Sequence, residues 1–500
     1  MFSSLKYSMF EYDFVAAAPA IEPGNTNPSP RQIYQNRKNF GVNLGSVFVL
    51  EKFIHDRFFI NDTGAELEAI TAQIHGCGES NTKNALETHW TTFISDDDWQ
   101  WLHSVGVTSV RVPIGYWDVN GGAFTEGTPF ASVAAVYKNA WNIYKSHFVE
   151  KAGQHNISVL VDLHAVPGGA NTGDHSGQKL DSPGFWNSSK YQAVALDCLK
   201  FIVEDLRKYD NIAGIQVVNE ATYDNPAPSQ SKYYKAALHK IRKRDASIPV
   251  VISDGWSPGQ WAEWVCQGEQ QAGGDLGVVV DCHVYRCFDD SDKSKTPDAI
   301  IHDLDNTVLQ GVDWKADTIV GEYSGVLDGQ TWDKFCGDRG GKVQEYLEHQ
   351  VRLFNTRAAG SYFWTLKFEH GDGGEWGFVP MVNSGAIPRR PTAVKDFPSA
   401  ELRDQILNAK LQEHSNYWNG ANPNESYEHH RFEDGFMMGW NDTAEFAKFD
   451  GSTIGRRHAW KNARRAEHAR AKGNSGFLWE WDQGFDAGAQ AFEEQAGIIQ

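Results

Sequence analysis

Two glutamates, Glu220 and Glu322, each stand near the end of a short apolar run, 212–220 and 317–323. Such runs are typical of strands buried in a parallel sheet, and the ends of parallel strands meet at one edge. Two carboxyl groups facing one pocket can hydrolyse a glycosidic bond, because one donates a proton to the leaving oxygen and the other attacks the anomeric carbon. Unpaired buried charge is costly, so a purely structural role does not explain both glutamates.

Arg111 and Tyr285 stand near the ends of two further apolar runs and could act on Glu322. Arg111 would keep a neighbouring carboxylate ionised, and the Tyr285 hydroxyl would donate a hydrogen bond to it. We therefore expect Glu322 to be the ionised nucleophile and Glu220 to be the protonated acid, with their pKa values separated by their surroundings.

Four more side chains at strand ends could bind the sugar. Asn219 would place its amide beside the sugar 2-hydroxyl, where a contact strengthens in the transition state. His164 and His283 would orient hydroxyls, Glu220 or both, although each alone is equally explained as a hydrogen-bonded structural histidine. Trp364 offers a flat surface on which a sugar ring can stack.

The elements that must position these residues alternate regularly from Asn39 onward. The expected strands are 39–45, 108–114, 157–164, 212–220, 249–254, 278–285, 317–323 and 360–367. The expected helices are 81–104, 132–153, 189–208, 229–245, 256–271, 297–310, 341–358 and 399–413. Eight strand–helix units predict an α/β fold, a (β/α)8 TIM barrel, over residues 36–413. A doubly wound sheet is disfavoured, since the sequence carries neither a good GxGxxG turn nor a P-loop.

Both ends of the chain depart from this alternation. Residues 1–35 are rich in Pro, Gly and Asn and are expected to form a flexible N-terminal arm. Residues 414–500 are expected to form a C-terminal helical extension packed on the barrel. Within it, 415–442 has the composition of a loop. Residues 456–472 predict a basic helix that packs on the acidic barrel, with a membrane or partner contact as the alternative. Trp479, Trp481 and Phe485 are expected to anchor this extension.

The overall charge excludes several kinds of partner. Lys and Arg total 46 against 65 Asp and Glu, which gives the 500-residue chain a formal net charge of −19. Nucleic acid and anionic membrane surfaces both need a basic face, so neither is expected as a partner. No run approaches about 18 apolar residues, so no membrane span is expected. The 18 Trp residues suggest flat surfaces for stacking a ligand.

The cysteines and the N-terminus bear on the compartment. The six cysteines are scattered without a CxxC pair, so free thiols are expected rather than a disulfide framework. Phe14 to Ala20 is a short apolar stretch, but Glu11 and Asp13 precede it where a signal peptide carries positive charge. We expect a cytoplasmic monomer.

Several stretches in order along the chain resemble glycoside hydrolase family 5, and within it the fungal exo-β-1,3-glucanase-like branch. The stretches are GVNLGSVFVLE (41–51), THWTTFISDDDW (88–99), VRVPIGYW (110–117), DLHAVPGGANTGDHSG (162–177), VVNEA (217–221), HVYRCF (283–288), VGEYSG (320–325) and FWTLKFE…EWGF (363–378). The resemblance covers about residues 36–390 and, with the expected compartment, suggests an intracellular-type member.

The resemblance implies a role for each matching residue. Glu220 matches the acid/base and Glu322 the nucleophile of a retaining β-glycosidase that removes terminal β-D-glucosyl units. Glu51 matches a residue that contacts the glucosyl unit, and Phe288 matches half of an aromatic clamp. The supporting site comprises Arg111, His164, Asn219, His283, Tyr285 and Trp364. The implied substrate is a small-molecule or oligosaccharide β-glucoside, and no cofactor or metal is implied.

Two positions depart from the glucanase pattern. Val47 replaces a Trp, and Gly173 stands where the glucanases carry the other aromatic half of the clamp. A missing stacking surface weakens the case for linear glucan and favours glucosides of lipids, sterols or other bulky aglycones. Trp117, Trp186, Trp256 and Trp376 could line the aglycone side or belong to the core.

Two alternatives of other classes stay open. A decayed barrel could bind carbohydrate without catalysis, since one fold hosts many functions. A metal-dependent hydrolase would use His164, His283 and a carboxylate as ligands.

Overall fold

A computed structural model describes residues 12–312 and 315–498. Eight parallel strands form a closed barrel in the order β1 to β8, so the predicted TIM barrel is confirmed. The strands are β1 Asn39–Asn43, β2 Ser109–Gly115, β3 Ser158–Ala165, β4 Ile212–Gln216, β5 Val250–Ser253, β6 Val278–Arg286, β7 Asp317–Leu327 and β8 Gly360–Phe363. Every expected strand is present, and each differs from its prediction by a few residues at the ends.

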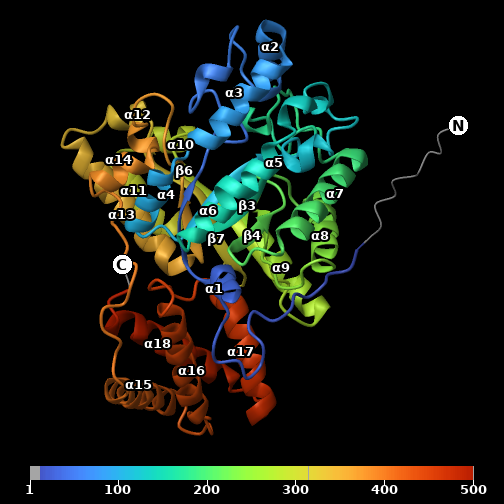
Figure 1. The fold of residues 1–500 in the computed structure, drawn as a ribbon. Coiled ribbons are helices and arrows are strands. Elements are labelled where there is room, and N and C mark those ends of the chain that lie inside the picture. The colour runs from blue at the N-terminus through green and yellow to red at the C-terminus, as the bar shows by residue number, and fades with distance from the viewer. Residues whose placement is uncertain (1–11, 313–314, 499–500) are drawn as a thin grey trace, which may run out of the picture. The chain divides into compact units, whose positions relative to one another are not determined.

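Helices surround the barrel, with α7, α8 and α9 on one side and α11 and α13 on another (Figure 1). They are α2 Glu66–Cys77, α3 Glu79–Thr92, α4 Asp96–Ser104, α5 Ala140–Ile143, α6 Glu150–Gln154, α7 Ser189–Leu206, α8 Pro228–Arg242, α9 Pro258–Ala272, α10 Asp290–Lys293, α11 Pro297–Thr307, α12 Gly329–Trp332, α13 Arg339–Arg357 and α14 Phe378–Asn383. The single helix expected over 81–104 is two, because Ser95 caps α4 through its side chain.

The barrel interior is layered. An apolar layer fills one end with inward-facing side chains from six strands and the residue before β8: Leu160, Ala213, Val251, Val279, Ile319, Ala359 and Tyr362. Above it lies a polar layer centred on Arg111, which contacts side chains of β1, β3, β4, β6 and β7. The two layers support the carboxyl ends of the strands, where a barrel of this kind places its working residues.

A second compact unit comprises Pro19–Lys38 and the chain from Arg390 onward. Its helices are α1 Pro30–Asn36, α15 Ala400–Ala421, α16 His430–Ala447, α17 Arg457–Lys472 and α18 Leu478–Gln495. The expected boundary at 413/414 is therefore wrong, because it falls inside α15. The prediction of a loop over 415–442 is also wrong over most of that range, because α15 continues to Ala421 and α16 begins at His430. Whether this unit packs on the barrel stays a prediction.

The prediction of a flexible arm over residues 1–35 is wrong for residues 12–35, the part that the structure describes. Residues 12–18 belong to the barrel unit, where the Phe14 ring lies edge-on to Trp264 at 4.9 Å. Pro19–Lys38 belongs to the second unit, where Ile33 and Tyr34 are buried. Ser29 and Gln32 form a capping box at the start of α1, which composition alone did not reveal. Residues 1–11 lie outside the described chain.

The predicted basic helix is α17, and its cations are paired within the second unit. Arg457 bonds Glu493 at 2.7 Å and Lys461 bonds Asp486 at 2.7 Å, both on α18. Arg464 bonds Asp442 of α16 at 2.7 Å. These carboxylates belong to the second unit, whereas the sequence predicted that the barrel would supply them. Trp481 and Phe485 likewise belong to the core of this unit.

Helices α16 and α18 approach so closely that their backbones touch. A Cβ added at Gly439 would lie 2.1 Å from the Phe485 carbonyl oxygen, and one at Gly435 would lie 2.2 Å from that of Trp481. The relation is reciprocal, since a Cβ at Gly488 would lie 2.0 Å from the carbonyl oxygen of Phe436. Glycines spaced by four on both helices therefore fix this contact.

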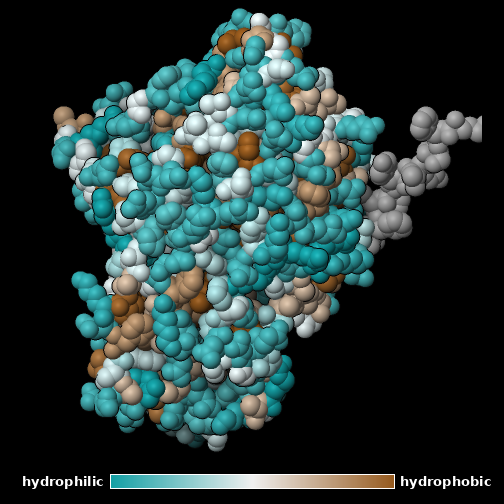
Figure 2. All heavy atoms as spheres, viewed as in Figure 1, coloured by the Kyte–Doolittle hydropathy of each residue, from teal (hydrophilic) through white to brown (hydrophobic). Residues whose placement is uncertain are grey.

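Hydrophilic residues cover most of the visible face of the molecule (Figure 2). Within the described chain, no helix combines the length and the apolar character that crossing a bilayer requires.

We expect Gly439→Ala to lower the free energy of unfolding of the second unit by about 1–3 kcal/mol, because the methyl group forces two packed backbones apart. Gly420→Ala is the matched control: Gly420 lies exposed on α15 with no atom within 4 Å of an added Cβ. That variant should be neutral or stabilised by up to about 1 kcal/mol. Equal unfolding free energies for the two variants in urea would contradict the packing described here.

Candidate active site

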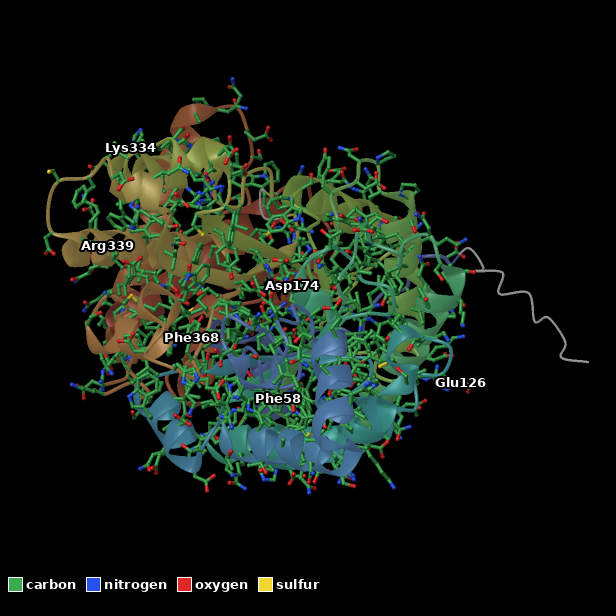
Figure 3. The ribbon with its side chains drawn as sticks, turned by 90° about the horizontal axis from the view of Figure 1, so that it is seen from above. Phe58, Glu126, Asp174, Lys334, Arg339 and Phe368 are labelled. Carbon is green, nitrogen blue, oxygen red and sulfur yellow. The ribbon has the colours of Figure 1, made fainter. Side chains whose placement is uncertain are left out.

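A pocket of about 830 Å³ opens at the carboxyl ends of the strands. Its floor includes Glu51, Glu220, Glu322 and Trp364. Asp174, on the loop after β3, lies near the middle of the view from above, whereas Glu126, Lys334 and Arg339 lie toward the periphery (Figure 3). The two glutamates predicted at strand ends therefore share one cavity.

Glu322, on β7, is 5 % exposed and is held by two donors. Arg111 Nη1 donates to its Oε1 at 3.0 Å, and the Tyr285 hydroxyl donates to its Oε2 at 2.8 Å. Both contacts were predicted from the sequence, and they fix the carboxylate plane in the pocket.

Arg111 is fully buried, and its guanidinium nitrogens contact side chains from several strands. Its Nη2 lies 2.9 Å from Asp162 Oδ2 and donates to Asn219 Oδ1 at 2.7 Å, and its Nε donates to Gln216. Burial alone lowers the pKa of the guanidinium, but Asp162, Glu322 and Asp281 outweigh burial and raise the pKa above its usual value. The cation is therefore permanent and orients both Glu322 and Asn219.

Glu220 follows β4 with a left-handed backbone, φ 41°. Its Oε1 lies 2.8 Å from His283 Nδ1, and its Oε2 lies 3.2 Å from His175 Nε2. The Asn171 side chain donates to the Glu220 backbone oxygen at 2.8 Å, which ties this turn to the loop after β3. Two imidazoles thus face the carboxyl group.

These imidazoles decide where the proton lies. Burial alone raises the pKa of Glu220, but His175 and His283 outweigh it and hold the pKa at about 2. Burial lowers the pKa of His283, but Glu322 and Asp281 raise it well above its usual value. The proton of the Glu220–His283 pair therefore resides on His283. The expectation that Glu220 itself carries it is not met there.

The nearest oxygens of Glu220 and Glu322 lie within 4.8 Å of each other, and His283 Nδ1 lies within the same distance of both. Carboxyl groups of retaining glycosidases stand about 5–5.5 Å apart, whereas inverting enzymes leave about 6.5–9.5 Å for a water molecule. The spacing in this pocket is of the retaining kind.

His164 and Asn219 form a second, supporting chain of hydrogen bonds. His164 Nδ1 lies 2.6 Å from Asp162 Oδ2, and Asn219 Nδ2 lies 3.3 Å from His164 Nε2. Since Arg111 occupies the Asn219 oxygen, the amide donates to Nε2 and His164 is protonated at Nδ1. The predicted pair is thereby fixed in one orientation.

The remaining predicted residues line the pocket. Burial, reinforced by Glu322 and Glu220, raises the pKa of Glu51 well above its usual value, so Glu51 is a neutral acid that can donate to a sugar hydroxyl. Trp364 is buried and its ring runs nearly parallel to His164 at 6.1 Å. Phe288, 64 % exposed, lies at the mouth.

His175 is a site residue that the sequence analysis missed. A lone histidine in a loop gives little signal, although it lies in the matched stretch 162–177. A Cβ added at Gly173 would lie 2.7 Å from the His175 ring. Gly173 therefore leaves room for the His175 imidazole, which contacts Glu220. At this point His175 takes the place of the aromatic side chain that the glucanase pattern carries.

Of the four tryptophans that could belong to the core or to the pocket, two lie in the core and two line the pocket. Trp117 is fully buried and stacks on Phe130 at 3.6 Å, and Trp186 is buried and donates to the Ala170 carbonyl. Trp256 and Trp376 line the pocket, and Trp256 is 51 % exposed.

The ligand set of the metal-dependent alternative is not brought together. Among the described residues, His283 groups with Glu220 and Glu322, whereas the ring nitrogens of His164 bond Asp162 and Asn219.

A TIM barrel with two carboxylates at retaining distance defines a glycoside hydrolase. The family profile "Cellulase (glycosyl hydrolase family 5)" matches residues 75–370, and the profile "Glucan 1,3-beta-glucosidase 3 C-terminal domain" matches residues 399–496. The chain belongs to glycosyl hydrolase family 5.

Relatives of similar length share both parts. An uncharacterised glycosyl hydrolase of Saccharomyces cerevisiae is 43 % identical over 92 % of this chain and 92 % of its own. Glucan 1,3-beta-glucosidase 3 of Schizosaccharomyces pombe is 31 % identical over 91 % of this chain and 95 % of its own. The crystal structure of rutinosidase from Aspergillus niger shares the fold with a TM-score of 0.57 at 18 % identity, covering 71 % of this chain and 98 % of that one.

We expect His175→Ala to move the basic limb of the kcat/KM profile to higher pH. His175 Nε2 faces two acceptors, Glu220 Oε2 at 3.2 Å and Asn171 Oδ1 at 3.0 Å, so it carries a hydrogen even in the neutral ring. Removing this donor disfavours the Glu220 carboxylate, so the Glu220–His283 pair binds its proton more tightly. Hydrolysis of an aryl β-glucoside followed across pH measures this shift. His75→Ala, an exposed histidine on α2, is the control. A basic limb that stays in place in His175→Ala would show that His175 does not act on the pair.

Proposed function

We propose that the chain hydrolyses terminal β-D-glucosyl units by double displacement, with Glu322 as nucleophile and the Glu220–His283 pair as acid/base. The observation that carries the proposal is the separation of at most 4.8 Å between the nearest oxygens of Glu220 and Glu322.

In the first step a Glu322 oxygen attacks the anomeric carbon and the bond from that carbon to the leaving oxygen breaks. The leaving oxygen takes a proton from Glu220, which receives it from His283 Nδ1 across their 2.8 Å hydrogen bond. In the second step Glu220 accepts a proton from water, the water oxygen bonds the anomeric carbon, and Glu322 is released. Asn219 and Glu51 bind sugar hydroxyls, and Trp364 supports the ring.

The substrate class rests on the pocket mouth and the relatives. Phe53, Trp256 and Phe288, each more than half exposed, line the mouth and offer stacking faces beyond the glucosyl position. Several relatives are named glucan 1,3-beta-glucosidase, which supports a β-1,3-glucan oligosaccharide. The same apolar mouth also suits a glucoside of a lipid, sterol or other bulky aglycone. A higher kcat/KM on an alkyl or steryl β-glucoside than on laminarin oligosaccharides would favour the second class.

We also propose that the protein acts as a cytoplasmic monomer. The six cysteines are all free, and Cys198, Cys282 and Cys287 are buried, which suits a reducing compartment. Gel filtration with light scattering and localisation of a tagged chain test the two parts separately.

We expect Glu322→Gln to lower kcat on an aryl β-glucoside by about 10³-fold or more, because the amide cannot form the glycosyl ester. Glu220→Gln should lower kcat least on substrates whose leaving group departs without being protonated. Glu126→Gln changes an exposed carboxylate that does not line the pocket and lies toward the periphery in Figure 3, so this variant should keep full activity. Sugar binding without turnover by the unmodified protein would instead support the non-catalytic alternative.

A further inference from the structure

Outside the catalytic pocket, the second unit brings together two histidines and a glutamate from separate parts of its fold. His414 lies on α15, His429 immediately precedes α16, and Glu480 lies on α18. Glu480 is fully buried and His414 is 8 % exposed. A buried carboxylate needs strong partners, and this one faces two imidazoles.

The donor atoms converge on one point. Glu480 Oε2 lies 2.9 Å from His414 Nε2 and 2.7 Å from His429 Nδ1, and all three atoms lie within 4.8 Å of one another. The other oxygen of Glu480 accepts the Glu428 backbone N–H at 2.8 Å, which fixes the carboxylate plane. Tetrahedral zinc, with bonds of about 2.0–2.2 Å, needs ligand atoms about 3.3 Å apart, so small side-chain rotations would admit it.

The surroundings of His429 suit a cation at this point. Its Nε2 lies 3.2 Å from Asn419 Oδ1, an acceptor, and in the tautomer that donates this hydrogen bond the hydrogen is on Nε2. Its Nδ1 then presents a lone pair to the Glu480 carboxylate at 2.7 Å, and two acceptors repel at that distance unless a cation or an added proton lies between them. Histidine ligands of metals are commonly oriented through the opposite ring nitrogen in this way.

Aromatic rings wall the cluster. The Phe432 ring stacks on His414 at 4.2 Å, and Trp479 and Trp418 lie 6.1 Å and 6.5 Å from His414. Such a shell lowers the local polarity, which strengthens the attraction between a divalent cation and its ligands. Two nitrogens and one carboxylate oxygen are a donor set suited to zinc.

We propose that His414, His429 and Glu480 form a zinc site that links α15, α16 and α18 of the second unit, with water in the fourth position. Asn419 is a positioning residue that acts through His429. The proposal is independent of the glycosidase reaction, which uses other residues.

The test uses the untagged full chain, stripped with a chelator and titrated with Zn²⁺ by calorimetry and with Co²⁺ by visible absorption. We expect one zinc per chain, a tetrahedral Co²⁺ spectrum, and quenching of tryptophan fluorescence by Co²⁺ because Trp418 and Trp479 adjoin the site. Bound zinc should raise the unfolding temperature of the unmodified protein. Failure of the unmodified chain to bind either metal would overturn the proposal.

Variants locate the site. His429→Ala and Glu480→Gln should each weaken zinc binding at least about 100-fold, and Asn419→Ala about 10-fold. His430→Ala, the exposed neighbouring histidine, should bind as the unmodified chain does. Glu322→Gln should also bind unchanged, which separates this site from the Glu220, His283 and Glu322 group. Zinc lost in Glu322→Gln but kept in His429→Ala would contradict the assignment.

Discussion

The buried guanidinium of Arg111 is the interaction on which the site depends. It stands in the polar layer of the barrel and contacts Asp162, Glu322, Asn219 and Gln216 at 2.7–3.0 Å. A permanent cation at the barrel centre is stable only because carboxylates surround it, and those carboxylates in turn need the cation. Removing either side would leave uncompensated charge in the interior, so the layer sets both the fold of the barrel core and the geometry above it.

The proposed catalytic chemistry depends on this balance between the Arg111 cation and the carboxylates around it. Arg111 holds Glu322 from below, and His283 lies between Glu220 and Asp281, within hydrogen-bonding distance of each. Negative charge on Glu322 and Asp281 raises the pKa of His283, so one proton is stored next to Glu220. In the proposed mechanism Glu322 becomes a neutral ester, so part of that stabilisation would be lost and the proton would be released toward the leaving group. The nucleophile and the acid are therefore coupled through His283.

Strand ends were predictable, because eight apolar runs buried on both faces carry an unmistakable pattern, and the polar residues after them stand out. Glu220, Glu322, Arg111 and Tyr285 could be assigned contacts for that reason. His175 could not, since a loop side chain reveals its partner only in three dimensions. The position of the proton on His283 also depends on the charges of Asp281, Glu322 and Glu220, which come from separate parts of the chain. In the second unit, glycines at 435, 439, 484 and 488 lowered the helical signal although they form the tightest helix contact.

The configuration of the first product tests the central claim most directly. Proton NMR during hydrolysis of an aryl β-glucoside distinguishes the anomers before mutarotation equilibrates them. Double displacement through Glu322, at the close carboxylate spacing of this pocket, predicts that β-glucose appears first and α-glucose only later. Initial release of α-glucose would mean a single displacement by water and would contradict the assignment of Glu322 as nucleophile.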